Sequence, residues 1–152
     1  MNQAYSFLNF NMGIVGPGGA FSIGNGSGVA DEGVTFSPTG EISTMTIGAD
    51  GNGMHTLHAD KSGTITVRLL KASPTNALLS LMYAFQTSNA ANHGQNTITG
   101  VDSARGDVIT CFQVAFSKAP DLTYAKEAGL VEWEFKAVRI ERLLGAGQVV
   151  GA

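Results

Sequence analysis

Residues 131–143 read VEWEFKAVRIERL, and this stretch decides the fold because apolar and charged side chains alternate along it. Successive side chains of a β-strand point to opposite faces, so such alternation indicates a strand with one buried and one solvated face. The apolar face carries Val131, Trp133, Phe135 and Ala137, and the polar face carries Glu132, Glu134 and Lys136. We therefore expect a long antiparallel strand here.

The alternation in this stretch changes phase after Ala137. Val138 and Ile140 are apolar, whereas Arg139 and Glu141 are charged. A slip of one residue moves every following side chain to the other face of a strand. The pattern therefore predicts a β-bulge or a sharp bend near Ala137 and Val138.

Other stretches of the chain carry similar strand signals. Residues 63–71, GTITVRLLK, put Ile65, Val67 and Leu69 on one face. The sequence GPGG at residues 16–19 separates two short apolar runs and predicts a hairpin with a tight turn. Further strands are predicted at residues 5–11, 12–15, 20–23, 29–37, 42–47 and 107–117, with a bulge at Gly33 and with Val108, Phe112, Val114 and Phe116 facing one way.

One helix is predicted at about residues 74–88. Ser73 is a suitable N-cap, and Pro74 suits the first helical position. The apolar stripe expected to pack on the protein's own sheet, at i, i+3, i+4 and i+7, consists of Leu78, Leu81, Met82 and Phe85. Many antiparallel strands and one helix predict a mainly β protein, a barrel or sandwich with a flanking α-helix, folded as a single domain over residues 1–152.

The composition narrows the classes of function. Charged residues make up only 14% of the 152 residues, whereas about 25% is usual for soluble domains. A net charge of −3 argues against electrostatic capture of nucleic acid. We expect no membrane span, no signal peptide and, with one cysteine, no internal disulfide. So little charge suggests that another molecule, such as a copy of the chain, covers part of its surface.

No group of side chains forms a catalytic or metal-binding pattern. His55 and His58 are three residues apart, which places them on opposite faces of a strand. Cys111 lies in an apolar stretch without a CxxC motif, so we expect a core residue. The run GNGSG at residues 24–28 lacks the Gly-Lys-Ser/Thr ending of a phosphate loop. We expect no enzyme, no catalytic residue, no cofactor and no metal.

The stretch GADGNGMHTLH at residues 48–58, followed by KSGTITVRLLKASP at residues 61–74, resembles tail tube proteins of contractile-tailed bacteriophages (myoviruses) of the phiTE-like type. Shorter matches are YSF near the N-terminus, the GPGG hairpin, GDVITC at residues 106–111, YAK at 124–126 and EWEF at 132–135. The resemblance extends over roughly residues 4–144 and consists of many ordinary positions rather than a catalytic signature.

The resemblance implies a structural role in the virion. Tail tube subunits form hexameric rings that stack helically into a hollow tube, and their strands join into a continuous sheet around the bore. A contractile sheath protein surrounds the tube, and the phage genome passes through the bore without specific binding. Tape measure, baseplate and tail terminator proteins are the other partners implied, with assembly in the cytoplasm of the host bacterium.

Two segments are predicted to be weakly anchored and are candidate contacts between subunits. A Gly-rich loop at about residues 38–54 is predicted to reach the adjacent ring, and the alternative is a solvent-exposed loop without a partner. Its candidate contact residues are Thr39, Glu41, Met45, Asp50, Asn52 and Met54. A flexible C-terminal tail at residues 144–152 and the strand at residues 5–11 are further candidates for crossing between subunits.

Charged side chains are candidates either for the bore or for the outer surface that meets the sheath, and both readings stay open. They are Asp31, Glu32, Glu132, Glu134 and Lys136. A neutral or acidic bore does not retain DNA phosphates. The alternatives for the whole chain are a tube protein of a non-contractile tail or of a secretion-system-like injection device, and a small β-barrel module that binds a ligand.

Overall fold

The computed structural model describes residues 10–24, 29–103, 105–126 and 129–145. Its strands are β1 (Phe10–Gly16), β2 (Gly19–Gly24), β3 (Val29–Pro38), β4 (Ser43–Ile47), β5 (Gly53–Leu57), β6 (Gly63–Leu70), β7 (Asn96–Asp102), β8 (Asp107–Lys118) and β9 (Leu130–Leu143). The helix α1 (Thr75–Thr87) and a short 3-10 helix η2 (Ala90–Asn92) connect β6 to β7. The helix predicted at residues 74–88 is confirmed, whereas most of the predicted strand at 5–11 and of the tail at 144–152 lies outside the described residues.

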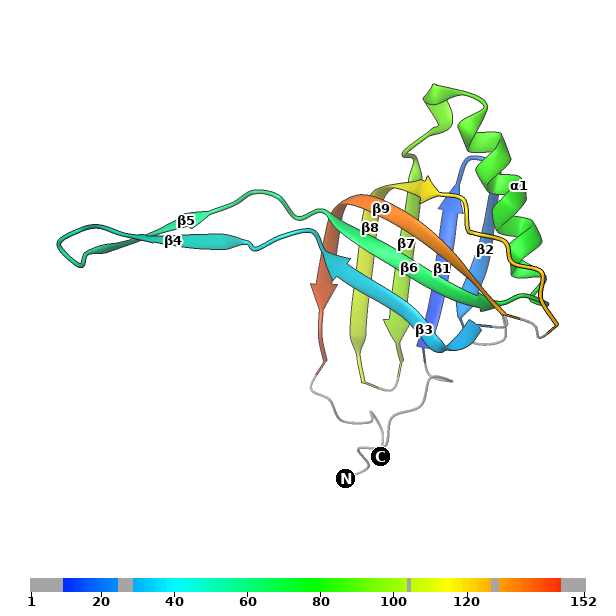
Figure 1. Cartoon of the computed structure of the whole chain (residues 1–152), viewed down its shortest axis with the longest axis horizontal. Coiled ribbons are helices and arrows are strands. Elements are labelled where there is room, and N and C mark those ends of the chain that lie inside the picture. The colour runs from blue at the N-terminus through cyan, green and yellow to red at the C-terminus, as the bar shows by residue number, and fades with distance from the viewer. Residues whose placement is uncertain (1–9, 25–28, 104, 127–128, 146–152) are drawn as a thin grey trace.

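Seven strands form one antiparallel sheet in the order β2-β1-β7-β8-β9-β6-β3. The sheet curls into a half-barrel in which β3, β6 and β9 cross over β1 and β7, and α1 lies along its open side (Figure 1). Within the described residues, the remaining strands, β4 and β5, pair with each other and with no other strand. The prediction of a mainly β, barrel-like protein with a flanking helix is confirmed.

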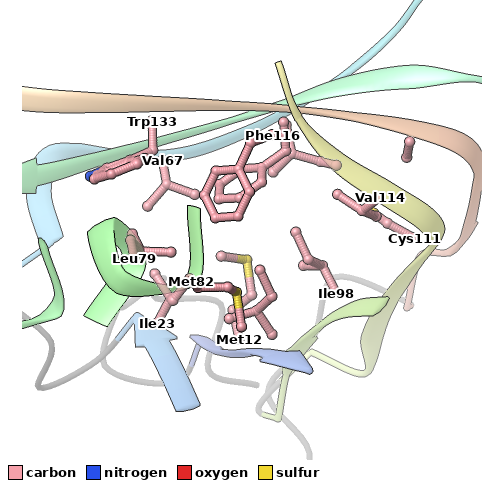
Figure 2. Close-up of a cluster of buried hydrophobic side chains, with 14 of the residues drawn as sticks. Met12, Ile23, Val67, Leu79, Met82, Ile98, Cys111, Val114, Phe116 and Trp133 are labelled. Atoms are coloured by element: carbon pink, nitrogen blue, oxygen red, sulfur yellow. The ribbon is translucent and has the colours of Figure 1, made fainter. Parts of the chain in front are cut away.

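The core lies between the curled sheet and α1 (Figure 2). The ring centroid of Phe116 lies 4.8 Å from that of Phe135 and 5.9 Å from that of Trp133, a spacing at which aromatic rings attract each other. Leu79 and Met82 of α1 contribute to the same cluster. The inward face predicted for β9 is confirmed, because Val131, Trp133, Phe135 and Ala137 are all buried.

Strands β8 and β9 change phase together, at the place predicted for β9. Val114 pairs with Ala137 and Cys111 pairs with Ile140, and all four side chains are buried. The two buried positions on each strand are three residues apart, so the buried face switches between them. Gln113 adopts a φ of 51°, a left-handed conformation that is uncommon outside glycine, and it marks the irregularity in β8.

This phase change makes two of the inward assignments on β8 wrong. Val108 is exposed, and Phe112 is only half-buried, with the guanidinium carbon of Arg139 4.5 Å from its ring centroid. On this half of the strand Cys111 occupies the buried face instead. The sequence-based prediction continued the alternation of β8 through Gln113 without a change of phase. It therefore assigned the wrong face to the residues of β8 that precede Gln113.

The bulge predicted at Gly33 of β3 is confirmed. The register of β3 against β6 shifts between Val29, which lies opposite Leu69, and Val34, which lies opposite Val67. Gly33 adopts a φ of 64°, which glycine reaches without the clash of a Cβ atom.

The stripe predicted to pack α1 on the sheet is wrong for three of its four residues. Met82 is buried, but Leu78, Leu81 and Phe85 are 46%, 69% and 49% exposed. The buried residues of α1 are Thr75, Leu79, Met82 and Gln86. The helix is turned so that the amide of Gln86 reaches hydrogen-bond partners inside the molecule. The other three apolar side chains therefore form an exposed flank.

Candidate assembly surfaces

The hairpin formed by β4 and β5 extends far from the half-barrel (Figure 1). It confirms the strand predicted at residues 42–47 and corrects the rest of the loop predicted at residues 38–54, because a second strand, β5, begins at Gly53 after a tight turn. Met45 pairs with His55, Thr46 pairs with Met54, and every residue of both strands is exposed. The matching alternation on the two sides of the Gly-rich turn was the sequence signal for the second strand.

The two ends of the hairpin are joined at its base by hydrogen bonds. The Thr39 N–H donates to the carbonyl of Ser62 at 3.0 Å, and the Ser62 hydroxyl donates to Thr39 Oγ1 at 3.1 Å. Further out, the His58 N–H donates to the carbonyl of Ile42 at 2.7 Å. Thr39 therefore holds the base of the hairpin, while the neighbouring Glu41 is exposed.

The tip of the hairpin is a hydrogen-bonded turn. The carboxylate of Asp50 accepts the Asn52 backbone N–H at 3.1 Å and the Asn52 side-chain amide at 2.8 Å. These hydrogen bonds lower the pKa of Asp50 below its usual value, since they stabilise the ionised form. The Gly51 N–H donates to the carbonyl of Gly48 at 3.0 Å, and Gly51 adopts a φ of 88°. Asp50 and Asn52 thus order the tip internally.

The hairpin carries apolar side chains and almost no charge. The exposed fractions of its large apolar residues in the two strands run from 57% for Met45 to 80% for Leu57. Within residues 42–58 the only Asp, Glu, Lys or Arg is Asp50, in the turn. The pairing register places Met45, Ile47 and Leu57 on the same face. An exposed apolar surface of this kind is typical of a contact with another protein.

The half-barrel has two open edges, β2 and β3, each paired on one side only within the described chain. The backbone N–H and C=O groups of an edge strand offer a template for another strand. The predicted charged residues Asp31 and Glu32 lie in β3, but their side chains are outside the described part of the structure.

The structure brings the other predicted charged residues together on the sheet face that points away from the core. Glu132 lies opposite Arg68, with a carboxylate oxygen 3.6 Å from Arg68 Nε. Glu134 and Lys136 follow along β9, and Arg68 also donates to Thr35 Oγ1 at 2.9 Å. Opposite charges thus offset one another on this surface.

The described residues contain no cluster of His, Cys, Asp or Glu that could hold a metal ion. The imidazole Nε2 of His58 lies 3.2 Å from Thr44 Oγ1 on the hairpin. Cys111 is buried, and burial raises the pKa of its thiol to about 11. Within the described part of the chain no helix has the length and apolar character needed to cross a membrane.

Comparisons with known proteins show which structures and which family the chain resembles. A solved structure with the same fold comes from the anti-feeding prophage baseplate, with a TM-score of 0.60 and 12% identity, covering 92% of this chain and 95% of that one. A second comes from the cap of the anti-feeding prophage, with a TM-score of 0.52 and 12% identity, covering 88% of each chain. A third comes from the sheath–tube complex of an extracellular contractile injection system, PVC, with a TM-score of 0.54 and 14% identity, covering 89% of this chain and 88% of that one. Among curated proteins none matches. The sequence model of the Bacteriophage PhiTE tail tube protein matches residues 2–145, so the chain belongs to this family and is a tail tube subunit.

Proposed function

We propose that copies of this chain form hexameric rings that stack helically into the hollow tube of a contractile phage tail. The phage genome passes through the bore of this tube without specific binding. Sheath, tape measure, baseplate and tail terminator proteins are the other partners, and assembly takes place in the host cytoplasm before the tail joins the virion. No catalytic role is part of the proposal.

The observation that carries this proposal is the projecting hairpin β4–β5. An isolated two-stranded hairpin is only marginally stable in water, and this one exposes Met45, Ile47, Met54 and Leu57. A neighbouring subunit that covers these side chains supplies the missing apolar burial. The hairpin therefore has the properties expected of an arm that reaches the next ring.

The open edges β2 and β3 support lateral contacts within a ring. An edge-to-edge contact between β2 of one copy and β3 of the next joins two different surfaces, and such head-to-tail contacts close into a ring when the rotation permits. The hairpin contact also joins different surfaces, but it repeats along an axis and yields a filament. A closed ring and an open stack together describe a tube.

The charged face of β6 and β9 is a candidate wall of the bore. Glu132 and Arg68 offset each other's charge there, and Glu134 stands near Lys136. A surface without net positive charge does not hold DNA phosphates, so a genome can move along it. The alternative placement of this face is against the sheath.

Electron microscopy of the purified protein at high concentration, with light scattering on the same sample, tests the proposal. We expect rings or tubes with hexagonal end views. Replacing residues 42–58 by a short Gly-Ser linker is expected to leave a folded monomer that forms no tubes, because the hydrogen bonds between Thr39 and Ser62, which lie outside the replaced segment, still join the base of the hairpin.

The matched control is Val138→Ser, which removes an apolar side chain of comparable exposure, 60%, outside the hairpin. This variant should form tubes as the native chain does. Normal tubes from the chain without its hairpin would exclude the stacking role, and a native chain that stays monomeric at every concentration would count against the tube itself.

A further inference from the structure

We infer that the exposed flank of α1, formed by Leu78, Leu81 and Phe85, is the docking site for the hairpin β4–β5 of a second copy of this chain. The inference rests on the tube proposed above and adds which surface of the neighbouring subunit receives the hairpin.

The flank is a fixed apolar surface. Leu78, Leu81 and Phe85 point away from the core, while Met82 beside them anchors the helix in it. Phe85 also packs closely on the β1–β2 turn, since a Cβ atom on Gly18 would lie only 3.0 Å from its Cδ1. The helix therefore presents these three side chains from a rigid support.

Both surfaces lack charge, which makes them compatible. Helix α1 contains no Asp, Glu, Lys or Arg between Thr75 and Thr87, and the two hairpin strands contain none either. When the hairpin strands pack against the helix flank, apolar area is removed from water and no charged side chain of either surface is buried without a partner. The outer sheet face would be a poorer site, because a hairpin seated there would have to desolvate Arg68 and Glu132.

The two surfaces lie at opposite ends of the molecule. In Figure 1 the hairpin leaves the half-barrel on one side and α1 lies along the other. A shift of one copy along the direction of the hairpin therefore brings its tip toward α1 of the next copy. Such a contact joins unlike surfaces and repeats without closing, as stacking requires.

The dimensions agree as well. At about 3.4 Å per residue, the five residues of β4 span about 17 Å. At about 1.5 Å per residue, the flank from Leu78 to Phe85 spans about 10 Å. The face formed by Met45, Ile47 and Leu57 is thus long enough to cover the flank.

Paired cysteine substitutions test this contact directly. The chain has one cysteine, the buried Cys111, so introduced surface thiols react selectively. Met45→Cys combined with Leu81→Cys is expected to give a ladder of covalent oligomers with a short bismaleimide once tubes have formed. The control pair, Met45→Cys with Val138→Cys, places the second thiol on another exposed surface and should give no ladder.

Charge substitutions supply a second, independent readout. Leu81→Glu should keep the monomer folded, because the side chain is exposed, and should raise the concentration needed for assembly by roughly tenfold or more. Ser80→Glu, an exposed position on another side of α1, should change it little. Met45→Lys together with Leu81→Glu should recover part of the loss.

The outcomes separate this inference from the proposed function. Tubes that form normally with Leu81→Glu, or that give no Met45–Leu81 crosslink, would overturn the docking site and leave the tube intact. A flank that only the sheath covers would leave the tubes of Leu81→Glu normal, and a flank covered by a lateral neighbour would give no Met45–Leu81 crosslink. A native chain that forms no assembly would contradict both proposals.

Discussion

Gln86 and Asn96 form two reciprocal hydrogen bonds between their side-chain amides, and neither side chain is exposed to solvent. Gln86 Nε2 donates to Asn96 Oδ1 at 2.7 Å, and Asn96 Nδ2 donates to Gln86 Oε1 at 2.8 Å. Gln86 also donates to the carbonyl of Pro17 at 2.8 Å. The pair ties the end of α1 to β7 and to the β1–β2 turn, and this sets the rotation of the helix that exposes the Leu78 flank.

Removing one amide of this pair should lower the free energy of unfolding. Gln86→Leu leaves the amide of Asn96 buried without its partner, so we expect a loss of about 1–3 kcal/mol in the free energy of unfolding, measured with urea. The control Thr87→Ala removes an exposed hydrogen bond to the carbonyl of Tyr83 and should cost much less. The double variant Gln86→Leu/Asn96→Leu should cost less than the sum of the two single changes; additive losses would mean that the pair is not coupled.

Gly16 should tolerate no side chain. A Cβ atom there would lie 1.8 Å from Asn96 Oδ1, so Gly16→Ala must displace the amide pair or the turn. We expect a lower melting temperature, equivalent to a loss of about 1–3 kcal/mol, recorded by circular dichroism. Gly40→Ala is the matched control, because its Cβ atom would have no neighbour within 4 Å. Equal melting temperatures for the two variants would contradict the close approach.

The tip of the hairpin should respond to acid. The hydrogen bonds from Asn52 lower the pKa of Asp50, so their contribution is present above the ordinary carboxyl pKa and is lost as pH falls through the lowered value. NMR titration of the Asp50 carboxyl should give a pKa below 3.8. Asn52→Ala keeps the backbone hydrogen bond and removes the side-chain one, so it should move this pKa part of the way back toward 3.8; an unchanged value would show that the Asn52 side-chain amide does not contribute to the shift.

The thiol of Cys111 should be unreactive while the protein is folded. Burial raises its pKa to about 11 from 9.0, so the thiolate that attacks disulfide reagents is scarce at pH 8. We expect very slow labelling by Ellman's reagent in buffer and full labelling in guanidinium chloride. Because folding favours the neutral thiol, its contribution to stability is lost as pH rises from 9 toward 11. Rapid labelling of the folded chain would contradict the burial.

Local patterns in the chain were sufficient for much of the fold. The alternation in β6 and β9, the GPGG turn and the bulge at Gly33 each depend on near neighbours, and the structure confirms them. Strand β7 was missed, because its buried positions include Asn96 and Asp102, which are polar. The prediction of contact residues in segment 38–54 stays a prediction, although the segment itself is a hairpin.

The sequence by itself determined the class of fold and the scarcity of charge, because strand alternation, turn residues and composition act within short stretches of chain. The family also followed from the sequence alone, through its match over residues 2–145. Only the tertiary structure decided which side of α1 is buried, since Gln86 finds Asn96 across the fold. It also decided that β4 and β5 project from the half-barrel rather than pack on it. An apolar pattern in the sequence shows which side chains favour burial. The surface that buries them is formed by residues distant in the sequence or by another copy of the chain, so the pattern alone does not identify it.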